Sequence, residues 1–308
     1  MDSAFRAVVV GGGPAGITAG IYLTRAGIKA ILLEKQLLGG AALNSEHIEN
    51  YPGFPEGVSG RELMARMAEQ ARKVGLPIAE FSRAEALELR GEDFITTTDQ
   101  GSYQSNGVIL ATGTELAKLN IPGEDAFLGR GISYCATCDG MFFQGLEVAV
   151  IGGGDSALSE ALSLANLARR VYIVHRRDKF RGQQILQDRI AGNGRIQLLL
   201  GKIPVRVNGS DQVESITLKD VVTGAEADLS VSGVFFYVGS RPDTGFAGHL
   251  VDRDEAGFIV TDEGLATRTR GLFAAGDVRK KALRQISTAV GDGALAAVTL
   301  ERLLLEGR

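Results

Sequence analysis

The sequence holds two cysteines, Cys135 and Cys138, which are separated by two residues and followed directly by Asp139. Two thiols at this spacing can close a small disulfide ring that is reduced and re-formed reversibly. The Asp139 carboxyl group could protonate a departing thiolate. We therefore predict a redox-active dithiol with Cys135, Cys138 and Asp139 as its catalytic residues. A catalytic disulfide of this kind gives no sign of an oxidising compartment.

Two other roles compete for the cysteine pair, and the sequence argues against both. A zinc site would need two more ligands, and His47, His175 and His249 are not clustered with the cysteines in the sequence. An inert buried pair would not need a carboxylate beside it. We therefore expect no metal site.

A glycine loop near the start of the chain is the second feature with a chemical meaning. Gly11, Gly13 and Gly16 form a G-x-G-x-x-G pattern between a strand-like run and a helix-like segment. Such glycines allow a tight turn and let the backbone approach a pyrophosphate, which the helix N-terminus then holds. Glu34 ends the next strand-like run, where a carboxylate suits a free ribose 2′-hydroxyl. The pattern predicts dinucleotide binding.

A second glycine loop lies 141 residues further on and ends in Ala157, an accepted variant of the third glycine. His175 stands at the position that corresponds to Glu34, and Arg176, Arg177 and Arg181 follow it. Arginine binds phosphate oxygens bidentately, so this cluster suits a 2′-phosphate. We predict NADPH rather than NADH at this loop, with a solvated basic turn as the alternative.

Strand and helix patterns around both loops indicate the elements that position these residues. In each half of the chain a strand-like run, a helix-like segment and a second strand-like run follow one another, which is the order of a βαβ unit. The six segments are Ala7–Val10, Ala15–Ala26, Ala30–Glu34, Glu147–Ile151, Ser156–Leu167 and Val171–His175. The constant offset of 141 residues indicates two related domains.

The remaining segments set the domain boundaries. A strand at Leu272–Ala275 and a helix over about Ser287–Leu305 form a tail that is too short to fold alone, so it completes the first domain. We predict an α/β fold of two Rossmann-like dinucleotide-binding domains, the second inserted in the first. Residues 1–114 and 243–308 form the first domain, and residues 115–242, with the cysteine pair, form the second.

Composition bears on partners and location. With 33 Lys and Arg against 37 Asp and Glu, the net charge is −4, which does not suit the binding of nucleic acid. No run approaches the ~18 apolar residues of a membrane span. We expect no membrane association and a cytoplasmic location.

The chain resembles the low-molecular-weight thioredoxin reductases over essentially its whole length. Besides the two loops, the resemblance rests on a set of short motifs. They are Ile48–Phe54, Ala111–Gly113, Cys135–Gly140, His175–Arg177 with Arg181, Gly276–Asp277, Arg284–Gln285, Thr288–Ala289 and Gly291–Ala294. The resemblance implies the two-dinucleotide-binding flavoprotein fold, FAD in the first domain, NADPH in the second, and a homodimer.

The resemblance also implies a cofactor role for individual residues. The first loop and Glu34 would hold the FAD pyrophosphate and ribose, Asp277 the ribityl chain, and the segment 284–286 the flavin. The FAD residues are Gly11, Gly13, Pro14, Ala15, Gly16, Glu34, Lys35, Gly40, Asn50, Ala111, Thr112, Gly113, Gly276, Asp277, Arg284, Gln285 and Ile286. The NADPH residues are Gly152, Gly154, Asp155, Ser156, Ala157, His175, Arg176, Arg177 and Arg181.

The resemblance further implies the electron route and the partner. Electrons pass from NADPH through FAD to the cysteine disulfide, with Cys138 facing the flavin and Cys135 exchanging with thioredoxin or a similar protein disulfide. The pairs 129–130 and 141–142 match positions where the family contacts thioredoxin. The second domain rotates between two orientations, and Thr112–Glu115 and Gly239–Thr244 suit the hinge.

Four places depart from the family pattern: Ala41–Ser45, Tyr134, Leu158–Ser159 and Ser240–Asp243. They cluster on the expected flavin and hinge contacts, which leaves open an altered electron route with ferredoxin or a second flavin in place of NADPH. The Tyr134 ring could pack against such a flavin. A flavin-loaded sensor without turnover is an alternative of another class, which the intact Cys-x-x-Cys-Asp motif disfavours.

Overall fold

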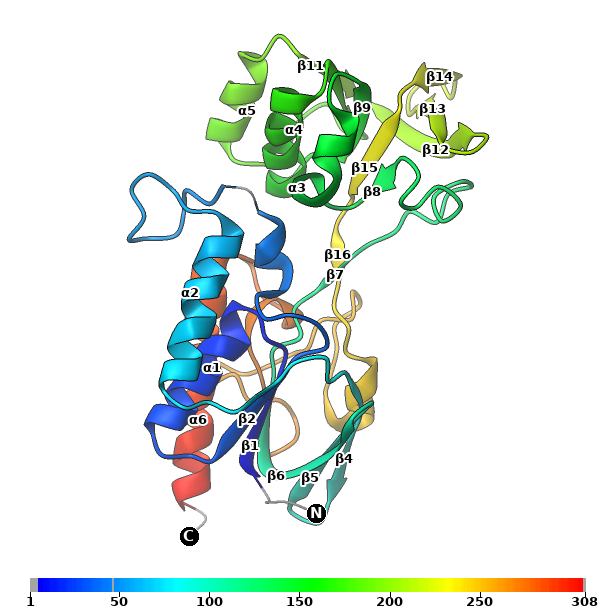
Figure 1. Ribbon diagram of the computed structural model, residues 1–308. Helices are drawn as coiled ribbons and strands as arrows, with labels where there is room; N and C mark the ends of the chain where they lie inside the picture. Colours follow the sequence, from blue (N-terminus) through cyan, green and yellow to red (C-terminus); the bar gives the residue numbers. More distant parts are fainter. Residues whose placement is uncertain (1–4, 46, 307–308) are drawn as a thin grey trace. The chain divides into compact units, whose positions relative to one another are not determined.

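The computed structural model describes residues 5–45 and 47–306, and in it the chain divides into two compact units (Figure 1). The first contains the chain up to Glu115 and again from Arg241 onward, and the second is Leu116–Ser240. Across the described residues no helix combines the length and the apolar character of a membrane span. Each unit has its own sheet and core.

The sheet of the first unit has a parallel centre and an antiparallel edge. Its order is β3-β2-β1-β6-β5-β4, and β17 pairs with β6. Strands β3, β2, β1, β6 and β17 are parallel neighbours, whereas β6, β5 and β4 form an antiparallel meander. The strands are β1 Phe5–Val10, β2 Ala30–Leu33, β3 Ile78–Ala79, β4 Ala84–Arg90, β5 Asp93–Thr98, β6 Gly101–Leu110 and β17 Leu272–Ala274.

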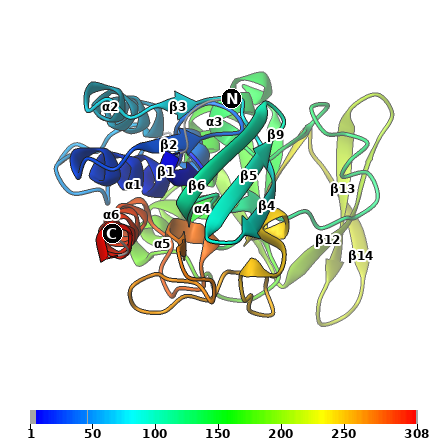
Figure 2. The same ribbon diagram turned by 90° about the horizontal axis from the view of Figure 1, so that it is seen from below.

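Both faces of this sheet are covered, which explains why β1 reads as a continuous apolar run. Ala7 and Val9 pack into the cluster that contains the helices, while Val8 and Val10 pack into a cluster on the opposite face. The helices α2, α1 and α6 lie side by side in Figures 1 and 2. The helical elements are α1 Pro14–Arg25, η1 Gly40–Asn44, α2 Gly60–Lys73, η3 Gly245–Leu250, η4 Gly276–Val278 and α6 Ile286–Glu306.

The second unit is built on a parallel sheet of order β11-β10-β9-β15-β8, accompanied by a separate antiparallel sheet of order β12-β13-β14. Val148 and Val150 of β9 pack with α4, and Ala149 and Ile151 pack with the antiparallel sheet. The strands are β8 Ile132–Ser133, β9 Glu147–Gly152, β10 Arg170–His175, β11 Ile196–Leu200, β12 Lys202–Gly209, β13 Val213–Asp220, β14 Glu226–Ser230 and β15 Gly233–Tyr237. The helices are α3 Ala136–Asp139, η2 Gly140–Phe143, α4 Asp155–Leu167 and α5 Gln184–Ala191.

The predicted α/β fold with parallel sheet cores is confirmed, and both βαβ units form where the sequence places them. The tail does join the first sheet, because β17 pairs with β6. The two segments that connect the units, β7 (Glu115–Leu116) and β16 (Ser240–Arg241), pair with each other. They lie at or beside the segments for which the sequence predicts hinges, and their role as hinges stays a prediction.

Candidate active site

The two cysteines are joined in a disulfide at the start of α3. Their Cα atoms lie 5.3 Å apart, and the Cys138 backbone N–H donates to Cys135 Sγ at 3.1 Å. The Ser133 hydroxyl holds the backbone of Cys135 on the other side, accepting from its N–H at 3.0 Å and donating to its carbonyl oxygen at 3.2 Å. The disulfide is therefore fixed by backbone contacts on both flanks.

Tyr237, the last residue of β15, gives α3 a further anchor that the sequence did not reveal. The backbone N–H of Ala136 donates to the Tyr237 hydroxyl oxygen at 3.0 Å. Burial, followed by the neighbouring Glu160 carboxylate with which the hydroxyl bonds, raises the pKa of Tyr237. Glu160 lies on α4 and is itself buried. One signal in the sequence could have pointed to this anchor, a tyrosine at the end of an apolar strand. A buried tyrosine hydroxyl needs a hydrogen-bond partner.

The residues after the disulfide separate into buried and exposed groups. Asp139 ends α3 half-buried, and its backbone N–H donates to the Cys135 carbonyl oxygen at 3.1 Å. Phe143 is a core residue, whereas Met141 and Phe142 are 65% and 79% exposed. Phe142 is therefore not a core aromatic, and the disulfide is followed by an exposed apolar pair.

The first glycine loop packs tightly on one side and is open on the other. Gly11 adopts a φ of +108°, and a Cβ there would lie 2.3 Å from the Ala111 carbonyl oxygen. A Cβ on Gly16 would lie 1.8 Å from the Gly11 carbonyl oxygen. Gly13, which precedes α1, has no described atom within 4 Å of such a Cβ. The Gly12 N–H donates to Glu34 Oε2 at 2.6 Å, so the carboxylate lies directly beside the loop.

Two other glycines expected at FAD approach this loop from distant parts of the chain. A Cβ on Gly40 would approach Gly13 Cα to 3.2 Å, and one on Gly276 would approach Ala15 Cβ to 2.8 Å. The Asn50 side-chain amide donates to Gln285 Oε1 at 3.0 Å. The other expected residues lie on the adjoining loops or helix starts: Pro14 begins α1, Ala111, Thr112 and Gly113 follow β6, and Ile286 begins α6. Lys35 instead pairs its ammonium with Glu115.

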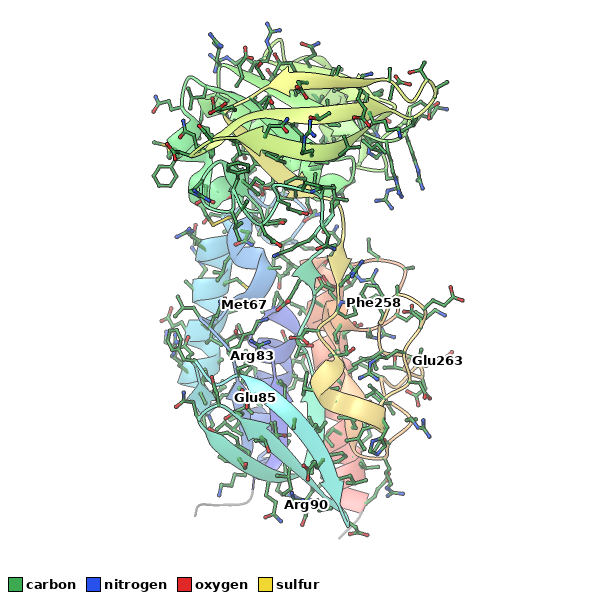
Figure 3. The ribbon with its side chains drawn as sticks, turned by 90° about the vertical axis from the view of Figure 1, so that its right-hand side faces the viewer. Met67, Arg83, Glu85, Arg90, Phe258 and Glu263 are labelled. Carbon is green, nitrogen blue, oxygen red and sulfur yellow. A yellow bond between two sulfur atoms is a disulfide. The ribbon has the colours of Figure 1, made fainter. Side chains whose placement is uncertain are left out.

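Asp277 lies in a cluster of charged groups. Its Oδ1 accepts no hydrogen bond from the described residues, and burial raises its pKa, which Lys281 and Arg284 oppose. Lys281 Nζ is 3.9 Å from this oxygen and 2.9 Å from Asp292 Oδ2. The guanidinium of Arg284 stacks over Phe258, labelled in Figure 3, with 3.8 Å between its carbon and the ring centroid.

These features fit FAD in the first unit. The backbone is open at Gly13, where a pyrophosphate must approach, and Glu34 stands beside it for a ribose. The buried Asp277 Oδ1 has no hydrogen-bond partner among the described residues, so it has an unused acceptor for a hydroxyl such as a ribityl chain would supply. Ala41–Asn44 lie in the short helix η1, whose Ala42 is buried in a small core cluster, so Ala42 serves packing.

The second glycine loop repeats the geometry of the first. A Cβ on Gly152 would lie 2.5 Å from the Tyr237 carbonyl oxygen and 2.8 Å from Ala157 Cβ, whereas Gly154 is open. Asp155 caps the neighbouring turn, accepting from the Gln183 backbone N–H at 2.7 Å. Ser156 is exposed in the first turn of α4. The loop and the free amides at the start of α4 fit a dinucleotide.

His175 lies beneath this loop with arginines around it. A Cβ on Gly153 would lie 2.5 Å from its ring, just as one on Gly12 would contact Glu34. Burial first, and then the charges of Arg181, Arg176 and Arg177, lower the pKa of His175. The imidazole is therefore neutral near pH 7, and the three exposed guanidinium groups form the positive surface beside it. This surface fits a 2′-phosphate.

The structure gives Tyr134 a role in its own unit. Its hydroxyl donates to Glu124 Oε1 at 2.7 Å, and its ring lies 5.9 Å from that of Phe236. Glu124 is buried and also accepts from two backbone N–H groups. Tyr134 therefore completes a core contact, and nothing in this arrangement favours stacking on a second flavin.

Known proteins match the chain along nearly its whole length. Residues 5–293 match the family described as pyridine nucleotide-disulphide oxidoreductase. A thioredoxin reductase of Bacillus subtilis (strain 168) is 41% identical over 308 residues, which is 99% of this chain and 96% of that protein. One of Treponema pallidum (strain Nichols) is 43% identical over 297 residues and 96% of each chain. The solved structure of Lactococcus lactis thioredoxin reductase matches with a TM-score of 0.96 at 42% identity, covering 98% of this chain and 99% of that one.

Proposed function

Because the chain belongs to the pyridine nucleotide-disulphide oxidoreductase family, among its thioredoxin reductases, we propose that it reduces the disulfide of thioredoxin with electrons from NADPH. It is an FAD-dependent oxidoreductase with FAD and NADPH as its cofactors. The observation that carries the proposal is the Cys135–Cys138 disulfide at the start of α3, in the same unit as the second glycine loop.

The first unit would hold FAD. The loop from Gly11 to Gly16 would bind its pyrophosphate, Glu34 its ribose and Asp277 its ribityl chain. Arg284, which the stacking on Phe258 holds in place, would border the flavin. Bound FAD supplies what no side chain here can, the acceptance of a hydride and the delivery of two electrons to a disulfide.

The second unit would hold NADPH. The open backbone at Gly154 and the start of α4 would bind the pyrophosphate, and Arg176, Arg177 and Arg181 the 2′-phosphate. These arginines favour NADPH over an electron route that begins at ferredoxin, because neither ferredoxin nor a flavin carries the 2′-phosphate that they suit.

The cysteines would carry the electrons to the protein substrate. Oxidation of NADPH releases a hydride, and with one proton its two electrons convert a disulfide into two thiols. Asp139 would hold the proton that Cys138 takes up when the ring opens. The Cys135 thiolate would attack the thioredoxin disulfide to form a mixed disulfide. Cys138 would then displace the reduced partner and close the ring again.

Several further assignments belong to the same proposal. The exposed Met141 and Phe142 support a contact surface for thioredoxin beside the disulfide, together with Gly129 and Arg130. The family resemblance supports a homodimer and a cytoplasmic location. It also supports a rotation of the second unit about the paired segments β7 and β16, with the first unit as the FAD domain and the second as the NADPH domain.

A coupled assay with purified thioredoxin and NADPH tests the function. The FAD-loaded chain should oxidise NADPH only when oxidised thioredoxin is present. Cys135→Ser and Cys138→Ser should each abolish this turnover while FAD stays bound, because no second thiol remains to resolve the exchange. A cysteine variant that keeps full turnover would refute the role of the disulfide. If the wild-type protein reduced thioredoxin with reduced ferredoxin as the electron donor but not with NADPH, the other electron route would be favoured.

A further inference from the structure

Asp292 of α6 organises the turn in which Asp277 lies. Its Oδ2 accepts from the Gly276 backbone N–H at 3.0 Å and lies 2.9 Å from Lys281 Nζ. Arg279 donates to both of its oxygens at 3.3 Å. The Lys281 side chain is only 8% exposed and lies between the carboxylates of Asp277 and Asp292. A lysine this buried is rarely found unless its charge is matched.

We propose that Lys281 is a positioning residue for FAD, whose buried ammonium keeps the Asp277 carboxylate charged and ready to accept a hydrogen bond from the ribityl chain. The inference rests on the proposed FAD site in the first unit. Lys281 touches the two aspartates of this cluster and would act on the cofactor through Asp277.

The balance of charges around Asp277 makes its ionisation sensitive to this lysine. Burial and the Asp292 carboxylate both favour the protonated form of Asp277, and Lys281 and Arg284 both favour the charged form. Arg279 pairs with Asp292 rather than with Asp277. Arg284 also donates to the Asp277 carbonyl oxygen at 3.3 Å. Removal of the Lys281 charge therefore leaves two neighbouring carboxylates with one cation fewer.

This balance predicts a pH dependence of FAD binding. A protonated Asp277 has one fewer acceptor site for a ribityl hydroxyl, so FAD affinity should fall as the pH drops through the Asp277 pKa. Because burial already raises that pKa above its ordinary value, the loss should begin at a higher pH than for an exposed aspartate. Loss of the Lys281 ammonium should raise the pKa further. Each unit of that rise weakens binding tenfold on the acid side of the transition.

The test measures the FAD dissociation constant of the apoprotein by flavin fluorescence, from alkaline pH down to the lowest pH at which the apoprotein stays folded. The fall in FAD affinity toward low pH is the acid limb. Lys281→Met should move the acid limb to higher pH, and Lys281→Arg should restore the wild-type position. Lys280→Met is the matched control, because Lys280 is the exposed neighbour and loses the same charge. Asp277→Asn should weaken binding, and in its background Lys281→Met should no longer move the acid limb.

A double variant separates charge from packing. In Lys281→Met with Asp292→Asn, the repelling carboxylate is also gone, so the limb should return toward the wild-type pH. An unmoved limb in Lys281→Met, an equal shift in Lys280→Met, or a double variant that behaves as Lys281→Met would each overturn the inference. If Lys281→Met yields no folded apoprotein, Lys281→Gln makes the same comparison. Absence of FAD binding by the wild-type protein would instead defeat the proposed function.

Discussion

Replacement of Tyr237 by phenylalanine tests how α3 and its disulfide are held. The variant keeps the ring and removes only the hydroxyl, which accepts from the Ala136 N–H and also bonds the Glu160 carboxylate. Ala136 is just 5% exposed, so water cannot readily replace the lost acceptor. An unsatisfied buried donor costs about 1–3 kcal/mol. If this loss falls on the local opening of α3, amide exchange there should become about 5–150-fold faster.

Hydrogen exchange of the oxidised protein, followed by mass spectrometry on peptides that span residues 133–143, measures this effect. Tyr172→Phe is the matched control, because its hydroxyl also bonds a carboxylate, Glu147, at 3.1 Å, but on β10. Exchange in α3 should accelerate in Tyr237→Phe alone. Unchanged protection of α3, or an equal effect of Tyr172→Phe, would refute the reasoning.

Three further predictions concern the two glycine loops and Tyr237. Arg176→Ala with Arg177→Ala should raise KM for NADPH much more than for NADH in steady-state assays, and equal effects would remove the 2′-phosphate argument. Gly13→Ala should fold normally but bind FAD more weakly, whereas Gly16→Ala should lower Tm, because only the second Cβ meets protein atoms. Because the pKa of Tyr237 is raised in the folded protein, its protonated hydroxyl contributes fully to folding stability below about pH 10, and this contribution is lost as the pH rises further. Tyr237→Phe should therefore reduce the alkaline loss of stability measured in urea titrations.

The sequence predicted the two glycine loops, the carboxylate beside the first and the basic residues beside the second, because these features depend on local patterns. A strand, a glycine turn and a helix are neighbours in the chain, so their spacing survives in the sequence. The correspondence between the two glycine loops, which the sequence offset predicted, also holds in the structure. Gly12 lies beside Glu34 in the first unit, and Gly153 lies beside His175 in the second.

Contacts between distant segments could not be predicted in this way. Ala136 and Tyr237 are 101 residues apart in the sequence, and nothing local indicates that one donates to the other. Lys281 reads as an ordinary surface lysine until α6 brings Asp292 against it. The packing of the second unit also decided that Tyr134 bonds a buried glutamate.

An anaerobic titration of the FAD-loaded protein with NADPH tests the electron route most directly. The wild-type protein should take up two electrons at the flavin and two more at the disulfide, so it should consume one more equivalent of NADPH than a Cys135→Ser, Cys138→Ser double variant before the flavin is fully bleached. Thiol labelling at the end point should modify both Cys135 and Cys138. Equal consumption by the two proteins, or a flavin that NADPH does not bleach, would contradict the proposed transfer from NADPH to the disulfide.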